Sequence, residues 1–597
     1  MPYQNGGNGG RRDHSVHFTL SGPPSTPSSR AASPAPYDFG RHNGRAETTD
    51  RNGLTYDDIY DYKFQGREVL PGQHSMDVYD ATLSWWRAAI RRKLVKAVER
   101  ESGMIAAIQK RIRTPWLDTY FVYTSSLGTH TFFMILLPTF FFFGHDEVGR
   151  GLLMILALGV YCSSVAKDLI CSPRPFAPPV TRLTIGSHHL EYGFPSTHST
   201  NSVSIALFFF GYVHTMASSG TISPQTYTIL TVILSIYTSS IVFGRIYTAM
   251  HSFTDCVMGI ILGAGIWWGH TSWSGIPVVL TSSNPLFWLS SALRASTPID
   301  STHAVIYVGK GLGAGKWLDL WVFRGGWEVP VILIPICLFL VHQHPQPVDD
   351  CPCFEDAIAF MSVVLGSLVG RWAVEYLGVG ALMGRTIVMP GSGWLLDAGG
   401  QWIQVDRGWS DVCLWWGVAA LKMVVGILAI FAWRILAKSA LHLILPPTYR
   451  LLARAFRLPH RRFYTPATEY KNVPSEFHAA GPGGGFGLHP IPSVIDLPAT
   501  GDIGFEVGGI GSGVNVNGPG NDFKKIRSVN NGSGVSSEKG GFVNVNGVDK
   551  DEEDEKVKHY DADVLTKVIV YAGIAVLASE VAPVMFEILG LGVKSWI

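Results

Sequence analysis

Long apolar runs separated by short polar clusters make up most of the chain between residues 119 and 436, and one more apolar run lies close to the C-terminus. A membrane-crossing helix needs about 20 largely apolar residues, so the pattern predicts about eight or nine spans, some of them tilted or extended by flanking residues. The candidate runs are residues 119–143, 151–170, 200–216, 227–243, 254–268, 329–342, 357–377, 412–436 and 564–589. We interpret the Pro- and Trp-rich piece between Gly275 and Trp327 as a re-entrant or interfacial segment.

Two long polar stretches lie outside the apolar runs. Residues 1–79 are rich in Gly, Ser, Pro, Asn and Arg, and residues 464–562 are rich in Gly, Asn and Ser. Such compositions cannot bury enough apolar surface to offset the entropy of the chain. We therefore predict a disordered N-terminal tail and a disordered insert, the latter followed by a C-terminal span within residues 563–597.

Residues 80–117 have a mixed character. Trp85, Trp86 and aliphatic residues recur at helical spacing among many Lys and Arg residues. We interpret this segment as a basic amphipathic helix at the membrane interface, where its cations would meet anionic head groups. A helix packed against the membrane domain is an alternative that the pattern equally allows.

The composition agrees with a membrane protein. Of the 597 residues, 47% are hydrophobic and only 16% are charged, which is too apolar for a typical soluble enzyme. The predicted fold class is all-α, a multi-pass transmembrane helical bundle with disordered tails. Residues 118–275 would form a catalytic membrane core, and residues 276–463 would add further spans and loops.

The net charge and the cysteine content limit the classes of partner and of site that we expect. The net charge of +1 indicates neither nucleic acid nor an acidic partner, so the lipid bilayer is the partner we expect. The seven cysteines lie mostly in apolar runs, where a thiol usually acts as a small hydrophobe. Cys351 and Cys353 flank a proline in a polar loop, but they lack a second pair of ligands. We therefore expect neither a disulfide framework nor a metal site.

Three polar clusters lie at the ends of apolar runs, at residues 167–175, 194–199 and 244–255. Charges in such places are costly unless they are paired or have a function, so three clusters within a short stretch require a common explanation. A membrane-embedded binding site for an anion would provide it.

The residue types of the clusters suit phosphate. Lys167 offers a compact charge, whereas Arg174 and Arg245 offer planar forks that bind two phosphate oxygens at once. Pro173 and Pro175 would end the preceding helix and place Arg174 on a turn. Ser196 precedes another apolar run, so it would lie at a helix N-terminus, where free N–H groups favour an anion.

The clusters also contain reactive groups. His251 and Asp255 are four residues apart, so the carboxylate can accept one ring N–H and leave the other ring nitrogen free to attack. His198 would protonate the leaving alkoxide and then activate water. A single interfacial cation is usually an anchor, and a single histidine near a helix end is usually structural. Together, these residues are hard to assign to anchoring.

The motifs Lys-x6-Arg-Pro, Pro-Ser-x-His and Arg-x5-His-x3-Asp, in that order, resemble the three signatures of the type 2 phosphatidate phosphatase and haloperoxidase superfamily, over about 90 residues. The resemblance implies a six-helix core. It also implies roles for the motif residues, which are phosphate binding by Lys167, Arg174, Ser196, Thr197 and Arg245, acid catalysis by His198, nucleophilic attack by His251 and orientation of His251 by Asp255.

Two positions depart from the superfamily pattern. Thr197 stands where the superfamily commonly has Gly, and Gly244 stands where it commonly has Ser. Thr197 still offers its backbone N–H, so we expect the phosphate cradle to survive. Gly244 removes one hydroxyl contact to the phosphate.

The Phe-Pro-Ser-Thr-His-Ser form of the second motif, the stretch 117–132 and the spans beyond six helices resemble the fungal long-chain-base phosphate phosphatases. The resemblance implies dephosphorylation of dihydrosphingosine, phytosphingosine or sphingosine 1-phosphate through a phosphohistidine, without metal or other cofactor, in the endoplasmic reticulum membrane. The alternatives are a phosphatase of another lipid, such as phosphatidate or a polyprenyl diphosphate, and a non-catalytic transporter or scaffold. Two basic stretches, residues 87–113 and 450–462, favour a cytosolic site, whereas the resemblance favours a lumenal one.

Overall fold

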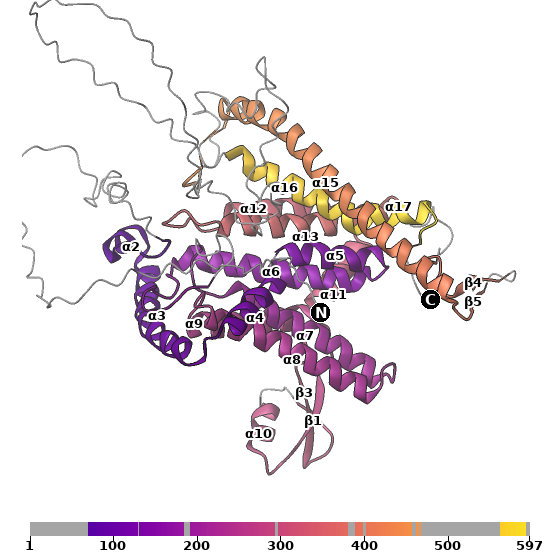
Figure 1. Ribbon diagram of the computed structural model, residues 1–597, viewed down its shortest axis with the longest axis horizontal. Coiled ribbons are helices and arrows are strands. Elements are labelled where there is room, and N and C mark those ends of the chain that lie inside the picture. The colour runs from indigo at the N-terminus through magenta and orange to yellow at the C-terminus, as the bar shows by residue number, and fades with distance from the viewer. Residues whose placement is uncertain are drawn as a thin grey trace, which may run out of the picture. The chain divides into compact units, whose positions relative to one another are not determined.

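The structure is a computed structural model, and it describes residues 70–128, 130–183, 191–292, 296–379, 388–397, 401–456, 461–464, 466 and 561–592 (Figure 1). Most of the predicted N-terminal tail and of the predicted insert lies outside these residues. Residues 70–79 belong to the predicted tail but are structured here, because α2 begins at Met76 and Tyr79 is fully buried. The boundary of the predicted tail was therefore placed too late in the chain.

The first part of the described chain is helical. Its elements are α2 (Met76–Thr82), α3 (Trp85–Ile112), α4 (Pro115–Ser125), the 3-10 turn η2 (Ser126–Gly128), α5 (His130–Phe142), α6 (Asp146–Ile170), α7 (Thr197–Ser218), α8 (Pro224–Tyr247) and α9 (Phe253–His270). The predicted apolar run 119–143 is therefore divided between α4 and α5, and the other runs up to residue 268 each correspond to one helix.

The second part mixes helices with short strands. Its elements are β1 (Ile276–Thr281), α10 (Pro285–Ala292), β2 (Ser296–Pro298), β3 (His303–Val308), α11 (Ala314–Arg324), α12 (Glu328–His342), α13 (Cys353–Tyr376), β4 (Trp394–Leu396), β5 (Trp402–Gln404), α15 (Trp409–Ala453), α16 (Asp561–Val576), the π-helix η5 (Leu577–Val581) and α17 (Ala582–Ile588).

The segment after α9 differs from the prediction. The prediction was a re-entrant or interfacial segment, and the structure has here β1, β3 and β2 in an antiparallel sheet in that spatial order, with Ile276 opposite Val308 and Thr281 opposite His303. The β-branched residues of β3 suit a pleated strand. Cys351 and Cys353 form a disulfide, which their sequence pattern did not indicate.

The prediction of a multi-pass helical bundle is confirmed. Five helices are long and apolar enough to cross a membrane, and shorter apolar helices lie at Phe132–Phe142 and Glu328–His342. The five are Asp146–Ile170, Pro224–Tyr247, Cys353–Tyr376, Trp409–Ala453 and the continuous segment Asp561–Ile588. Helices α7 and α9 correspond to two more of the predicted runs.

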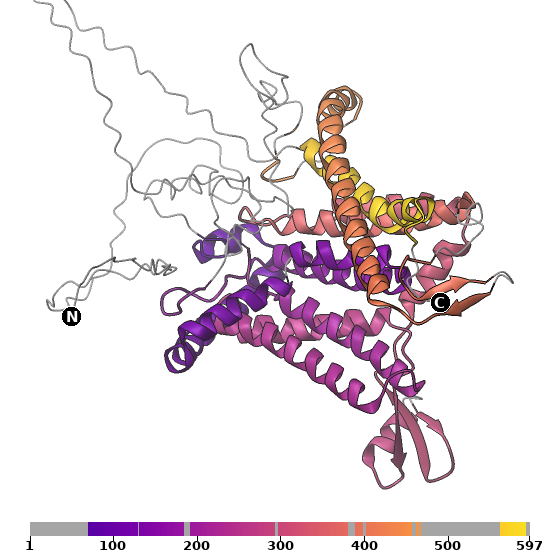
Figure 2. The same ribbon diagram turned by 45° about the vertical axis from the view of Figure 1, so that its right-hand side comes forward.

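Helix α6 is central to the packing. It contacts α7 and α9 on one side and α13 on the other, while α13 also packs against α12 and α16. Figures 1 and 2 show α6 between the magenta group α7–α9 and the later helices α13 and α16. Since the apolar core runs through α6, the end of this helix is well fixed where the first polar cluster begins.

Close approach of α9 to α7 depends on glycine. A Cβ atom at Gly259 would come within 2.6 Å of the Ser196 carbonyl oxygen, and one at Gly263 would overlap the Thr200 carbonyl oxygen. We expect Gly263→Ala to lower the free energy of unfolding by roughly 2 kcal/mol, because overpacking forces the two backbones apart. Thermal melting of the detergent-solubilised protein measures this.

Gly265→Ala is the matched control, since nothing lies within 4 Å of the Cβ atom that this change adds to α9. Equal melting temperatures for the two variants would contradict the close packing of α7 on α9.

Helix α3 joins the ends of the other helices. Arg87 donates to the Asp168 and Leu169 carbonyl oxygens at the end of α6, and Gln109 donates to the Tyr247 carbonyl oxygen at the end of α8. At the start of α9, Thr254 donates to the Glu101 carboxylate. Of the two interpretations of this helix, the structure supports packing against the domain. Trp85 nevertheless remains 82% exposed, as an interfacial anchor would be.

Candidate active site

The end of α6 places the first cluster. The helix stops at Cys171, which takes a left-handed conformation (φ 55°), and Pro173 and Pro175 follow it, as predicted. The loop that carries Gly193 packs against this turn, because a Cβ at Gly193 would come within 2.6 Å of the Pro173 carbonyl oxygen. Glycine therefore allows the second cluster to approach the first.

Lys167 and Arg174 share one partner that the sequence did not indicate. Lys167 Nζ lies 2.6 Å from Glu191 Oε2, and Arg174 Nη2 lies 3.4 Å from the same oxygen. Arg174 Nε also donates to the Glu191 main-chain carbonyl oxygen at 2.8 Å. Both cations are almost fully buried, so a carboxylate oxygen lies between two cations that suit phosphate.

Arg174 also reaches the third cluster. Its Nη1 atom donates to the Met250 carbonyl oxygen at 2.8 Å and lies 3.3 Å from His251 Nε2. The other ring nitrogen, Nδ1, lies 2.8 Å from the Gly193 carbonyl oxygen. A carbonyl can only accept, so Nδ1 carries the proton and Nε2 presents its lone pair beside Arg174.

Asp255 contributes differently from the prediction. Its Oδ2 atom accepts from the Ser252 N–H at 2.8 Å, as part of a capping box at the start of α9, and lies 3.8 Å from His251 Nδ1. The distance to the imidazole exceeds a hydrogen bond. The predicted hydrogen bond from His251 is therefore made to Gly193, and the Asp255 carboxylate lies near the ring without a hydrogen bond to it.

The second cluster caps α7 as predicted. Ser196 is the N-cap residue, and its side chain accepts from the Ser199 N–H. The Ser196 N–H donates to the Asp255 carbonyl oxygen at 3.1 Å, which ties the second cluster to the third. Thr197 and His198 open the helix and are partly exposed, so this end of α7 faces the accessible side of the site.

Two buried donors in the second and third clusters lack partners among the described residues. They are Arg245 Nε, in the last turn of α8, and the Thr197 hydroxyl. Buried polar groups are rarely left without a partner, so such donors suit a ligand with acceptor oxygens. Packing also favours glycine at position 244, next to Arg245, because an added Cβ atom there would lie 3.1 Å from the Phe121 ring.

The electrostatics of the site affect His251 most. Burial and the positive charges of Arg174, Arg245, Lys167 and His198 hold the pKa of His251 well below its usual value. The imidazole is therefore neutral near pH 7, as a nucleophile must be. Residues from all three clusters therefore lie near one imidazole ring.

Sequence reasoning missed Glu191 and the Gly193 carbonyl oxygen. Glu191 had one weak signal, because it is a lone carboxylate three residues before Phe194 in the second cluster. The Gly193 carbonyl belongs to the main chain and had none.

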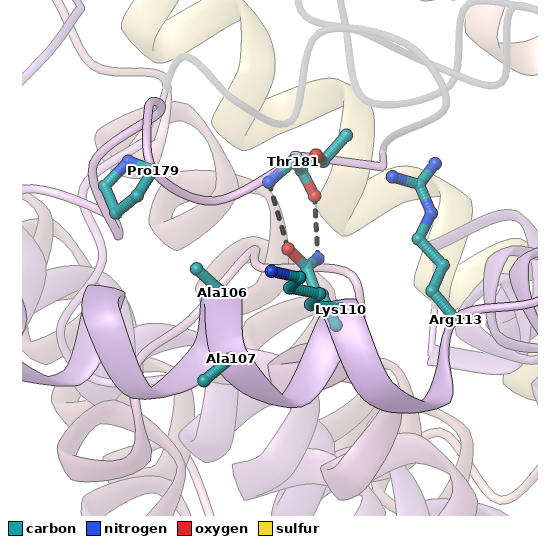
Figure 3. Close-up of a pocket in the computed structure, with 7 residues that line it drawn as sticks. Ala106, Ala107, Lys110, Arg113, Pro179 and Thr181 are labelled. Carbon is teal, nitrogen blue, oxygen red and sulfur yellow. Dashed lines mark hydrogen bonds between the residues drawn. The ribbon is translucent and has the colours of Figure 1, made fainter.

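A separate hollow of about 400 Å³ lies between α3 and the loop after Arg174. Figure 3 shows Lys110, Pro179 and Thr181 around it, with hydrogen bonds that join Gln109 to Thr181. None of the residues of the three clusters lines this hollow. It is therefore distinct from the cation site.

Comparison with known proteins gives matches over the same region. The model of the PAP2 superfamily matches residues 149–276, which include all three clusters. A dihydrosphingosine 1-phosphate phosphatase of Schizosaccharomyces pombe is 30% identical, over 62% of this chain and 74% of that protein. A dihydrosphingosine 1-phosphate phosphatase of Saccharomyces cerevisiae is 31% identical, over 52% of this chain and 67% of that protein. A lipid phosphate phosphatase of Arabidopsis thaliana is 32% identical, over 30% of this chain and 45% of that protein.

Proposed function

The chain belongs to the PAP2 superfamily, and from this premise we propose that it hydrolyses sphingoid base 1-phosphates to the free base and phosphate through a phosphohistidine. Lipid phosphatase activity is common to the named relatives. The substrate rests on two fungal relatives that are named as dihydrosphingosine 1-phosphate phosphatases.

The proposed mechanism depends on the contact between His251 and Arg174. His251 Nε2, which holds a lone pair, lies 3.3 Å from Arg174 Nη1, a donor suited to phosphate oxygens. A phosphoryl group held by Arg174 would therefore lie next to a nitrogen able to attack it. Lys167 and Arg245 would neutralise the remaining charge, and the Thr197 N–H group and the Ser196 hydroxyl would donate to phosphate at the start of α7.

The reaction would run in two displacements. The Nε2 lone pair attacks phosphorus, the bond from phosphorus to the lipid oxygen breaks, and His198 gives its proton to the leaving alkoxide. Water then attacks the phosphohistidine, His198 takes a proton from that water, and inorganic phosphate leaves. Gly193 holds the Nδ1 proton throughout, and the Asp255 carboxylate favours the positive charge that develops on the ring.

The experiment is phosphate release by the purified full chain in detergent micelles. We expect turnover of a sphingoid base 1-phosphate in the presence of EDTA, because three cations do the charge neutralisation that a metal would otherwise supply. Phosphatidate and a polyprenyl diphosphate are compared at the same concentration.

Faster turnover of either comparison lipid would assign the chain to that substrate instead. Loss of activity in EDTA that Mg²⁺ restores would overturn the metal-independent mechanism. Absence of phosphate release from every lipid would favour the transporter or scaffold. The proposed site of action is the endoplasmic reticulum membrane, which microscopy of the tagged protein would test.

The substitution His198→Gln allows the two displacements to be measured separately. We expect lipid turnover to fall about 10²- to 10⁴-fold, because general acid and base assistance is lost. With p-nitrophenyl phosphate the leaving group needs no proton, so only the second displacement slows. A burst of nitrophenol and an acid-labile phosphoenzyme should then appear in rapid-quench measurements.

His303→Gln changes an exposed histidine of β3 and is the control, for which we expect wild-type kinetics. A His198→Gln protein that hydrolyses the lipid at the wild-type rate would remove His198 from the mechanism.

A further inference from the structure

We propose that Glu191 selects lipid phosphates that carry an ammonium group beside the phosphate ester. This inference rests on the proposed function and specifies the substrate class of the same site. Lys167 and Arg174, two of the three cations suited to phosphate, both contact Glu191 Oε2.

Glu191 cannot leave the site easily, because its carbonyl oxygen and the two residues that follow it are held in place. Its carbonyl oxygen accepts from Arg174 Nε at 2.8 Å. The next residue, Tyr192, is fully buried and donates its hydroxyl to Asp349 Oδ2 at 2.8 Å. Gly193 N–H then donates to the Ser172 carbonyl oxygen at 2.8 Å. An incoming phosphate would therefore displace the side chain of Glu191 rather than its main chain.

A carboxylate retained next to a phosphate dianion has an electrostatic cost. Like charges at short range repel strongly where water is scarce. Lys167 and Arg174 cannot fully neutralise the Glu191 carboxylate and the phosphate at the same time. The cost disappears if the substrate brings its own cation. A sphingoid base 1-phosphate does so, because its amine and its phosphate are on adjacent carbon atoms.

The position of Glu191 fits this role. Its side chain is 14% exposed, whereas those of Lys167 and Arg174 are 4% and 3% exposed. The carboxylate is therefore the more accessible partner, and we expect the lipid part of a bound phosphate to lie next to it. When the phosphate takes over Lys167 and Arg174, Oε2 becomes free to accept from the substrate ammonium.

A plain counter-ion would behave differently. If Glu191 only balanced the buried cations, neutralising it would change all lipid phosphates alike. Recognition of an ammonium group instead predicts opposite effects on substrates with and without that group. The ratio of two substrates is therefore the informative measurement.

The experiment compares Glu191→Gln with the wild-type full chain in mixed micelles. The substrates are sphinganine 1-phosphate and octadecyl phosphate, which has the same chain length but no amine. Loss of a charge-assisted hydrogen bond should reduce the preference in kcat/KM for the amine substrate about ten- to hundredfold. We expect octadecyl phosphate to be hydrolysed faster by the variant than by the wild type, and Glu191→Asp to keep part of the preference.

Glu99→Gln, which removes an exposed carboxylate from α3, is the control and should leave the ratio unchanged. An unchanged ratio in Glu191→Gln, with both substrates faster or both slower, would overturn the inference while leaving the phosphatase function intact. If the wild type hydrolyses neither substrate, the proposed function itself fails. Melting curves of each variant separate a folding defect from either result.

Discussion

Replacing His251 with alanine is expected to lower kcat for phosphate release by a factor on the order of 10⁴ or more, because no other group can form the covalent intermediate. The imidazole is buried and hydrogen-bonded to Gly193 through Nδ1, and its Nε2 atom accepts from Arg174. Radiolabelled phosphate should also fail to appear on the protein in rapid-quench experiments. Both are measured with the proposed lipid substrate in detergent micelles.

His303→Ala is the matched control, since His303 lies in β3 of the small sheet and its side chain is 43% exposed. A His251→Ala protein with substantial phosphatase activity would exclude His251 as the nucleophile. Because His251 packs inside the site, unchanged melting of the variant is needed before a loss of activity is attributed to chemistry.

Arg174→Lys should lower kcat/KM by about 10²- to 10³-fold, although the charge is kept. The guanidinium uses all three of its nitrogen atoms, because Nε and Nη2 contact Glu191 and Nη1 contacts both the Met250 carbonyl oxygen and His251. A single ammonium group cannot reproduce this fork, so the transferring phosphoryl group would lose a donor and its alignment with Nε2. Steady-state kinetics with the proposed substrate measure the loss.

Arg324→Lys, at the exposed end of α11, is the control for an arginine exchange and should behave as wild type. Near-normal kcat/KM in Arg174→Lys would mean that charge alone is enough at this position. The phosphate would then have to be held mainly by Lys167 and Arg245.

Local spacing determined most of the candidate site. Proline after α6 placed Arg174 on a turn, a serine before an apolar run placed Ser196 at the cap of α7, and four-residue spacing placed Asp255 near His251. These relations lie within one helix or one turn, where backbone geometry limits the outcome. The apolar runs likewise predicted the helices, because hydrocarbon thickness sets their length.

Tertiary structure alone decided which groups from distant segments meet. The Gly193 carbonyl oxygen rather than Asp255 accepts the His251 proton, because Asp255 is engaged in capping α9. Glu191 lies between Lys167 and Arg174 only because glycine at position 193 lets its loop pack against the end of α6. A main-chain acceptor has no signature in the amino-acid sequence, and a lone glutamate has no periodicity. Their partners depend on how all the helices pack together, which short-range patterns do not specify.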